Sequence, residues 1–503
     1  MSNTIYHKIF KFKKKKVEFL IKSKYIKNKN NILFFGNPIH SDLNKINETN
    51  LLSEIKNIEG FFLILILKKN NIFLYNDILA NFRLYYKKNT QSLVLSNDYN
   101  FFIKKKKIGS LDYEEFNFWM SKNYTSGDKT FFNNLFKFAP ASILNIDENL
   151  NITIKNNFKN FIKFSNSNSI KSLEKSINNS IKLLKNTQKK IILLFSGGAD
   201  SLLLAQKLKE KNCNFECVYF ATKPNTFESE KGYRLAKQCA KKLNLKLNVI
   251  PIQFKINETK FKNILKVMLF DFHTCIVQFY GVSKILKKFG RNIEIVSGQS
   301  ADSILCFGPS ASTLSNFVNR TLYLKNNFFT NFLIRVYLEN KYKVKLFAPK
   351  NKFENFYFFY NSFFYYPLYK GDNTKKDISI KNKIKIIINS LKLKDGFIKM
   401  YLKIFGFLQG PDNQILIQSC SFHNFSNISL PYVTSRIISS TCYKQNKLKT
   451  VINPKYEIKT LLNNDCIKVL NSNRPNIIGL KKITSETPKI KKMYLKRINE
   501  LKK

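Results

Sequence analysis

Short runs of apolar residues alternate with stretches of helical spacing through the middle of this chain. Four runs have the length and β-branched content of buried strands: residues 191–195, 216–220, 247–252 and 293–296. Apolar residues recur every three or four positions in the stretches around them: residues 170–184, 202–208, 228–243 and 275–289. This alternation predicts a doubly wound parallel α/β sheet, whose ligands bind beyond the carboxyl ends of the strands.

The pattern is different on either side of this region. Residues 60–66 and 72–77 are two strand-like runs close together, and they predict a hairpin. Residues 353–369 are rich in Phe and Tyr, and we interpret them as the core of a helical part because large aromatic side chains are usually buried. A chain of 503 residues is long enough for two large domains, each with its own core.

The net charge of the chain is large, but it changes the prediction little. The formal net charge is +53, which by itself favours a nucleic-acid or anionic-membrane partner. Lysines are spread over the whole sequence, with dense runs only at 13–16 and 104–107, so we interpret them as solvated surface and expect no nucleic-acid partner. Nucleic-acid binding stays open as an alternative that rests on charge alone.

Nothing in the pattern predicts export or membrane insertion. The longest apolar run, residues 61–67, is far shorter than the ~20 residues that span a bilayer. The basic N-terminus lacks the apolar stretch of a signal peptide. The eight cysteines form no CxxC pair and the four histidines show no metal-ligand spacing. We therefore expect a cytoplasmic protein.

The residues most informative about chemistry follow the first of the four predicted strands. Directly after Leu194 and Phe195 the chain reads Ser196-Gly197-Gly198-Ala199-Asp200-Ser201. Two glycines let consecutive backbone N–H groups point at one phosphate oxygen, and the following helix presents its positive end there. The hydroxyls of Ser196 and Ser201 add donors, and the Asp200 carboxylate fits if Mg²⁺ bridges it to pyrophosphate. The alternative is an ordinary Gly-Gly turn with a helix cap.

This turn resembles the SGGxDS signature of the PP-loop ATP pyrophosphatases, and the surrounding order resembles the synthetase domain of asparagine synthetases. A second match follows the fourth predicted strand and is similar to the family's SGEGADE segment: Ser297-Gly298-Gln299-Ser300-Ala301-Asp302-Ser303. The resemblance implies that ATP is bound by Leu194, Ser196 to Ser201, Ser297 and Gly298. It also implies that Asp200 and Asp302 hold Mg²⁺; Asp302 read alone is a helix N-cap.

The second match departs from the family at three positions. Gln299 stands where the family usually has a glutamate, Ser300 replaces a glycine, and Ser303 replaces a second glutamate. Gln299 joins Asp200 and Asp302 as a candidate catalytic position. A neutral amide cannot accept a proton as a carboxylate does, so Gln299 cannot assist an attacking amine in that way.

The first third of the chain resembles a class II glutaminase domain. Residues 77–86 are similar to its RDxxGxxPLYY stretch and residues 130–147 to its closing region. The resemblance implies a glutaminase-like antiparallel β-sandwich over 1–165. The family's nucleophile is an N-terminal cysteine, whereas here Ser2 follows Met1 and the first cysteine is Cys213. We therefore expect this domain to be degenerate and glutamine hydrolysis to be absent.

The same resemblance implies an asparagine synthetase-like ATP-binding domain over 166–503, with a nucleotide core at about 190–310 and a helical remainder at 311–503. Residues 430–436 are similar to the family's R-V-P-F-L-D turn, and residues 454–459 to its K-x-x-L-R helix start. Asn476 stands in place of the late lysine that binds the adenylate's phosphates in relatives, two residues after Arg474. Lys481 or Lys482 is the candidate substitute.

The predicted function is that of an ATP-dependent amide-forming ligase. A small-molecule or peptidyl carboxylate is adenylated with release of pyrophosphate, and ammonia or an amine, from solution or a partner protein, attacks the mixed anhydride. Aspartate is the family's best-known substrate, and a sugar acid, a peptide or a β-amino acid stays open. A catalytically silent nucleotide-binding or regulatory protein is the alternative, and a homodimer is left open.

Overall fold

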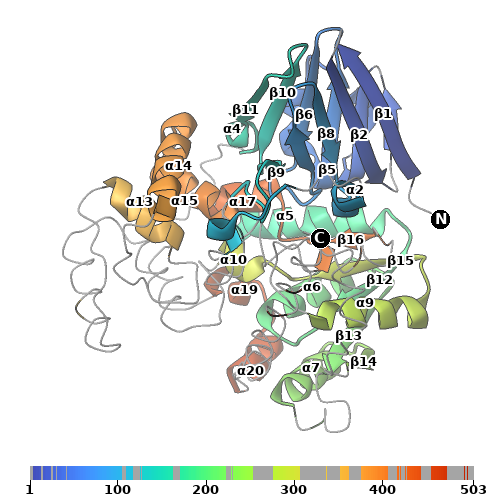
Figure 1. The fold of residues 1–503 in the computed structure, drawn as a ribbon. Coiled ribbons are helices and arrows are strands. Elements are labelled where there is room, and N and C mark those ends of the chain that lie inside the picture. The colour runs from blue at the N-terminus through green and yellow to red at the C-terminus, as the bar shows by residue number, and fades with distance from the viewer. Residues whose placement is uncertain are drawn as a thin grey trace.

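The computed structural model is a mixed α/β protein, with two mainly antiparallel sheets near the N-terminus and one parallel sheet further along the chain (Figure 1). It describes residues 4–305 with gaps, of which 253–275 is the longest, and beyond them chiefly residues 352–361, 375–405, 427–442 and 455–472. Among these residues no helix combines the length and apolar character needed to cross a bilayer.

The N-terminal part contains a five-stranded and a six-stranded sheet. The five-stranded sheet has the order β1 (Thr4–Phe12), β2 (Lys15–Ser23), β8 (Ser92–Ser96), β7 (Tyr85–Lys88) and β9 (Leu135–Lys137). The six-stranded sheet has the order β11 (Ile152–Asn156), β10 (Ser142–Asp147), β6 (Asn71–Asn76), β5 (Glu59–Leu67), β4 (Ile32–Ile39) and β3 (Ile26–Lys29). The pairs are antiparallel except β2 with β8, which is parallel and departs from the expected antiparallel arrangement. The glutaminase-like character of this part stays a prediction.

Strand β5 shows why the apolar run at its centre is continuous. Leu63 and Leu65 point into the core that the two N-terminal sheets share. Phe62, Ile64 and Ile66 point to the opposite face, where they join the core that extends to the parallel sheet. Because alternate side chains of a strand lie on opposite faces, a strand buried on both faces must be apolar at every position. Its partner β6 is antiparallel, which confirms the predicted hairpin.

The parallel sheet has the order β14 (Leu247–Pro251), β13 (Phe215–Ala221), β12 (Lys190–Leu194), β15 (Ile293–Ser297) and β16 (Ile428–Ser429). The first four strands in sequence lie within one or two residues of the predicted runs. The fifth, β16, was not predicted, and it comes from the region expected to be a helical remainder. Two residues are too short a run to produce a readable pattern.

The described helices between residues 170 and 305 are α5 (Ile170–Lys185), α6 (Ala199–Glu210), α7 (Lys231–Lys242), α9 (Ile276–Phe289) and α10 (Ala301–Leu305). Those that follow are α13 (Lys352–Asn361), α14 (Lys375–Leu391), α15 (Asp395–Lys403), α17 (Ser435–Cys442), α19 (Tyr456–Thr460) and α20 (Asn464–Ser472). Phe356 and Tyr360 of α13 are each 2% exposed, so its described part is core, as predicted; residues 362–369 lie outside the described residues.

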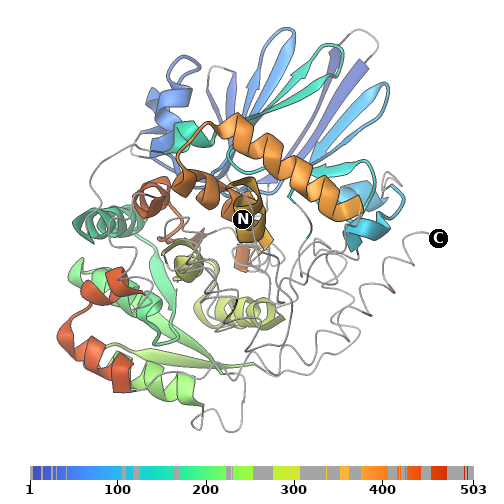
Figure 2. The same cartoon turned by 90° about the vertical axis from the view of Figure 1, so that its left-hand side faces the viewer.

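The N-terminal sheets and the later helices are joined by specific contacts. Figure 2 shows α14 and α15 running beside the lower ends of the N-terminal strands. Lys383 of α14 forms an ion pair with Asp128, and the Tyr401 hydroxyl donates to the carbonyl of Pro140 at 3.4 Å. The Tyr401 ring also packs on Phe158, with ring centroids 5.2 Å apart. The short N-terminal helices complete this region: η1 (Leu43–Lys45), α1 (Leu51–Glu54), η2 (Ile55–Asn57), α2 (Tyr99–Lys104) and α4 (Phe158–Phe161).

Candidate nucleotide-binding site

Strand β12 lies at the point where the strand order of the parallel sheet reverses. After β12 the chain adds β13 and β14 on one side, then returns to place β15 and β16 on the other. The last residue of β12, Leu194, pairs with Val218 of β13 and with Ser297 of β15. A crevice forms beyond the carboxyl ends of strands at such a reversal, because the connections leave in opposite directions. Both predicted motifs therefore begin at this edge.

Gly197 makes the close turn between β12 and α6. Its φ is +73°, in the left-handed region that side chains disfavour. A Cβ atom on Gly197 would lie 2.7 Å from both the backbone N and the Cα of Ala236 on α7. The thiol of Cys239, one turn further along α7, donates to the Gly197 carbonyl at 3.6 Å. Glycine is required here because the turn packs directly on the backbone of α7.

Hydroxyl groups close the turn over the start of α6. The Ser196 N–H donates to Ser201 Oγ and the Gly198 N–H donates to Ser196 Oγ, each at 3.3 Å. The Ser201 hydroxyl donates to the Gly198 carbonyl at 3.1 Å. Gly198 is the N-cap residue and Ala199 begins the twelve-residue helix. These bonds hold the turn in place at the N-terminus of α6, where the first N–H groups of a helix are donors that an anion such as a phosphate binds.

The loop after β15 lies against the same turn. A Cβ atom on Gly298 would lie 3.1 Å from Cβ of Asp200 and 3.2 Å from the backbone N of Ser201. Ser297 is 8% exposed and its hydroxyl accepts the Gln299 N–H at 3.1 Å. Gln299 is half-buried at this edge. The structure thus brings the two motifs into contact across about a hundred residues of sequence.

Ser300 and Asp302 are two further residues of the second motif. Ser300 has a φ of +68°, which explains physically why a glycine suits this position in the family it resembles. Asp302 lies in α10, but its side chain is outside the described part. The pairing of Asp302 with Asp200 around a metal ion stays a prediction. The late positions Arg474, Asn476, Lys481 and Lys482 also lie outside the described residues.

Lys455 is the site residue that sequence reasoning missed. Its Nζ lies 2.6 Å from Oδ2 of Asp200, and the two side chains are 21% and 17% exposed. Lys455 is the N-cap of α19 and has a φ of +63°, in the left-handed region that side chains disfavour. The similarity of residues 454–459 to a family helix start was the available signal. It could not show that this lysine meets a carboxylate 255 residues earlier.

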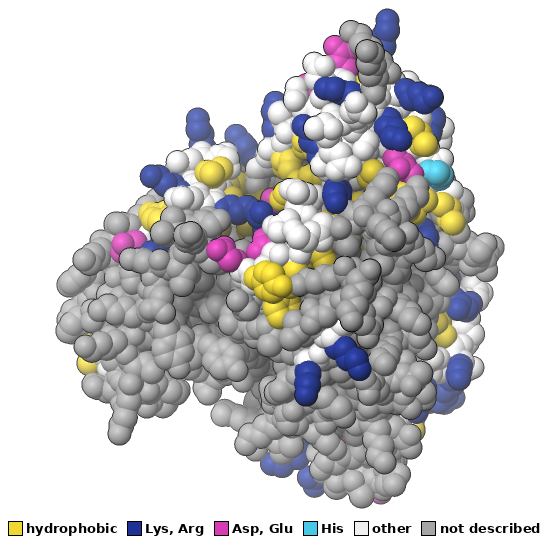
Figure 3. Space-filling view, in the orientation of Figure 1, with side chains coloured by type: hydrophobic (Ala, Val, Ile, Leu, Met, Phe, Trp, Pro, Cys, Tyr) yellow, Lys and Arg dark blue, Asp and Glu magenta, His cyan; other side chains and the backbone are white. Residues whose placement is uncertain are grey.

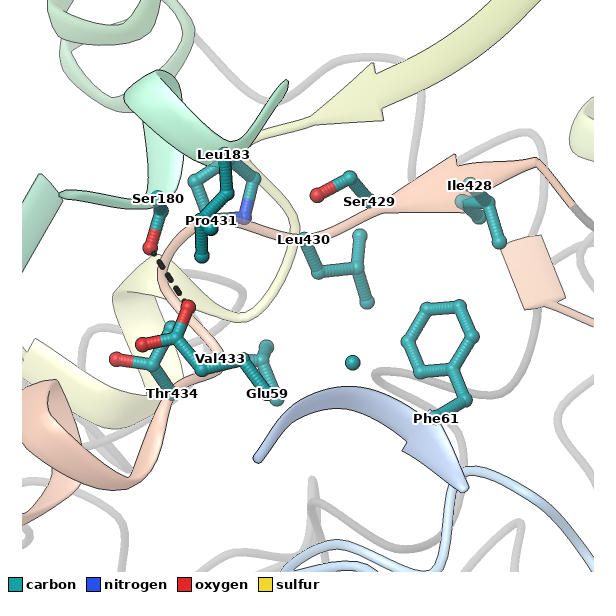
Figure 4. Close-up of a pocket in the computed structure, with 11 residues that line it drawn as sticks. Glu59, Phe61, Ser180, Leu183, Ile428, Ser429, Leu430, Pro431, Val433 and Thr434 are labelled. Atoms are coloured by element: carbon teal, nitrogen blue, oxygen red, sulfur yellow. Dashed lines mark hydrogen bonds between the residues drawn. The ribbon is translucent and has the colours of Figure 1, made fainter. Parts of the chain in front are cut away.

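The turn that follows β16 also contacts Asp200. The Tyr432 hydroxyl donates to the backbone carbonyl of Asp200 at 2.9 Å, and Tyr432 is fully buried. The neighbouring residues of this turn line a small pocket toward the N-terminal sheets (Figure 4). There Glu59, at the start of β5, accepts a hydrogen bond from Ser180 of α5 at 3.3 Å. Residues 428–434 therefore connect the N-terminal part to the first turn of α6.

The hydrogen-bond donors at this edge are suited to ATP phosphates, and the site also supplies one metal ligand. The N–H groups, two serine hydroxyls and the Lys455 ammonium are complementary to negative charge. The Asp200 carboxylate is a ligand type that Mg²⁺ accepts. Among the described residues no group of three or more His, Cys, Asp or Glu side chains could hold a metal ion. Phosphate and water oxygens are further ligands that Mg²⁺ accepts.

Comparison with known proteins gives one curated relative. No family model matches the chain. Microcin J25-processing protein McjC of Escherichia coli is 24% identical over 233 residues, which are 46% of this chain and 44% of McjC. The matched region thus spans less than half the length of that relative.

Three solved structures show weaker likeness. NH3-dependent NAD synthetase of Campylobacter jejuni is 15% identical, covering 46% of this chain and 90% of that one, with a TM-score of 0.21. U34-tRNA thiolase NcsA of Methanococcus maripaludis is 14% identical, covering 47% and 78%, with a TM-score of 0.21. Glutamine-dependent NAD+ synthetase of Acinetobacter baumannii is 12% identical, covering 68% and 59%, with a TM-score of 0.20. Scores this low bear on neither the fold nor the function.

Proposed function

We propose that the chain is an ATP-dependent ligase that activates a carboxylate as its adenylate and transfers the acyl group to an amine. The observation that carries the proposal is the contact between the two motifs at the reversal of strand order, with Lys455 beside Asp200. The match to McjC supports the same class. Because McjC is named for processing a microcin, we favour a peptidyl carboxylate over free aspartate.

The reaction follows from the donors at this edge. A carboxylate oxygen attacks the α-phosphorus of ATP, and the bond to the β-phosphate oxygen breaks so that pyrophosphate leaves with the electron pair. Backbone N–H groups at the start of α6 and the Lys455 ammonium stabilise the charge that develops on the leaving oxygens. Mg²⁺, held by Asp200, would supply further neutralisation of pyrophosphate. The amine then attacks the acyl carbon, loses a proton, and displaces AMP.

The experiment is ATP–pyrophosphate exchange with a panel of carboxylates: a microcin-like peptide, aspartate, a β-amino acid and a hexuronic acid. We expect exchange with at least one of them, and a decrease of at least 100-fold in Asp200→Asn and in Lys455→Met. Lys468→Met is the matched control, because Lys468 is an exposed lysine on the adjacent helix α20. That control should retain exchange within about twofold, since an isolated surface charge contributes little.

The alternative is a nucleotide-binding protein without turnover. The presence of Gln299, where the family that the chain resembles usually has a glutamate, favours this alternative. Tight ATP binding with no exchange for any carboxylate would establish that alternative and refute the ligase. Normal exchange in Asp200→Asn would instead show that the first turn of α6 is not the reaction site.

A further inference from the structure

Among the described strands, β1 is the edge strand of its sheet, and its register shows which backbone N–H and carbonyl groups face this open edge. β2 lies between β1 and β8. The Lys16 N–H donates to Gln91 on the β8 side, and both the N–H and the carbonyl of Lys22 bond the side chain of Asn97, which follows β8. The backbone N–H and carbonyl groups of the even-numbered residues of β2 therefore face β8 and point away from β1. Lys16 and Lys22 pair with Lys11 and Ile5.

In an antiparallel pair, when the backbone N–H and carbonyl of one residue point away from the partner strand, those of the residue opposite it also point away. The residues of β1 whose N–H and carbonyl groups face the open edge are thus Ile5, His7, Ile9 and Lys11. Their side chains are all exposed on one face of the sheet. Ile5 is 56% exposed and Ile9 is 46% exposed. The open edge offers four backbone donor and acceptor pairs beside an alternating row of apolar and basic side chains.

The side chains on β1 and β2 carry more positive than negative charge. These two strands have five lysines, at positions 8, 11, 15, 16 and 22, and one acidic residue, Glu18, and Lys22 is paired with Asp98 at 2.6 Å. Glu18 is 5% exposed and already accepts from His7 at 3.2 Å. Figure 3 shows dark blue and yellow side chains over the strands at the upper right, with a cyan side chain beside a magenta one. A second copy would place like charges opposite one another, which is unfavourable.

We infer that the open edge of β1 binds an extended, acidic segment of a partner polypeptide by adding it as a further strand. The backbone groups of Ile5, His7, Ile9 and Lys11 supply the hydrogen bonds, as in other cases of strand addition. Apolar side chains of the segment lie against Ile5 and Ile9, and acidic ones against His7 and Lys11. The surface is separate from the nucleotide site and does not depend on the ligase activity.

The probe is a fluorescein-labelled peptide of sequence VTETVTETV, in which Val and Glu alternate on one face and which reads the same in both directions. We expect saturable binding to the full-length protein by fluorescence anisotropy, weakened by added salt because exposed charges are screened. The same peptide with Lys in place of Glu, and one N-methylated at alternate amides, should each bind at least tenfold more weakly, which corresponds to about 1.4 kcal/mol.

The protein variant is Ile9→Pro, which removes an N–H that faces the open edge; edge strands tolerate proline at such positions. Binding should fall at least tenfold, whereas Ile9→Val, which keeps the N–H, should stay within twofold. Circular dichroism checks that both variants fold, and the N-methylated peptide tests the same bonds on the unmodified protein. Three results would overturn the inference: equal binding of the Glu and Lys peptides, no effect of N-methylation, or a dimer of the protein that Ile9→Pro dissociates.

Discussion

Replacing Gly197 by alanine tests whether the turn beyond β12 needs glycine for space as well as for its backbone angle. Gly290 is a matched control, because its φ of +76° nearly equals the +73° of Gly197. A Cβ atom on Gly290 would have no heavy atom within 4 Å, whereas one on Gly197 would lie 2.7 Å from the N and Cα of Ala236. The two substitutions therefore share the backbone strain and differ in the collision with α7.

The magnitudes follow from these two terms. A left-handed backbone costs a non-glycine residue about 1–2 kcal/mol, and alanine recovers about 0.4–1 kcal/mol by restricting the unfolded chain. Gly290→Ala should therefore lower the free energy of unfolding by about 1 kcal/mol. Gly197→Ala adds overpacking against a helix backbone, which costs about 1–3 kcal/mol. Its total should be about 2–4 kcal/mol.

Urea unfolding without nucleotide measures both values, and ATP binding by calorimetry follows the function. We expect Gly197→Ala to weaken ATP binding at least tenfold, because moving the turn away from α7 displaces the N–H groups that face the phosphates. Gly290→Ala should bind ATP normally. Equal destabilisation by the two substitutions, or unchanged ATP binding in Gly197→Ala, would refute the close packing of this turn and its role.

Two further predictions concern titrating groups. Gln299→Glu should leave ATP–pyrophosphate exchange within a few-fold, because the phosphates are bound elsewhere, but it should make amide formation depend on pH through the added carboxylate; collapse of exchange would place Gln299 at the phosphates instead. Burial raises the pKa of Asp77 to about 6, despite backbone N–H donors from Leu79, Asn81 and Phe82. The folded state thus binds the proton more tightly than the unfolded state, so this group's contribution to stability is complete below about pH 4 and is lost as the pH rises through 6. That loss is about 3 kcal/mol at about 1.4 kcal/mol per pKa unit. In urea titrations at pH 4 to 7 it should disappear in Asp77→Asn, and an identical slope in the variant would contradict it.

Local pattern was sufficient to predict most elements of the parallel sheet and the helices near them in sequence. Strands β12, β13, β14 and β15 and helices α5, α7 and α9 lie within a few residues of the predicted runs. Each is long enough to show its period, and neighbours in sequence fold against one another, so short-range information sets their type. The positions of Gly197 and Gly198 after β12 were predicted for the same reason.

Contacts between distant residues were decided only by the tertiary structure. The sequence marked Asp200, but nothing in it indicated that Lys455 and Tyr432 reach that residue from 255 and 232 positions away. The sequence also did not predict the two-residue strand β16 or the parallel pairing of β2 with β8. Periodicity reports which face of an element is buried, but not which element covers it; the packing of the whole chain determines the partner.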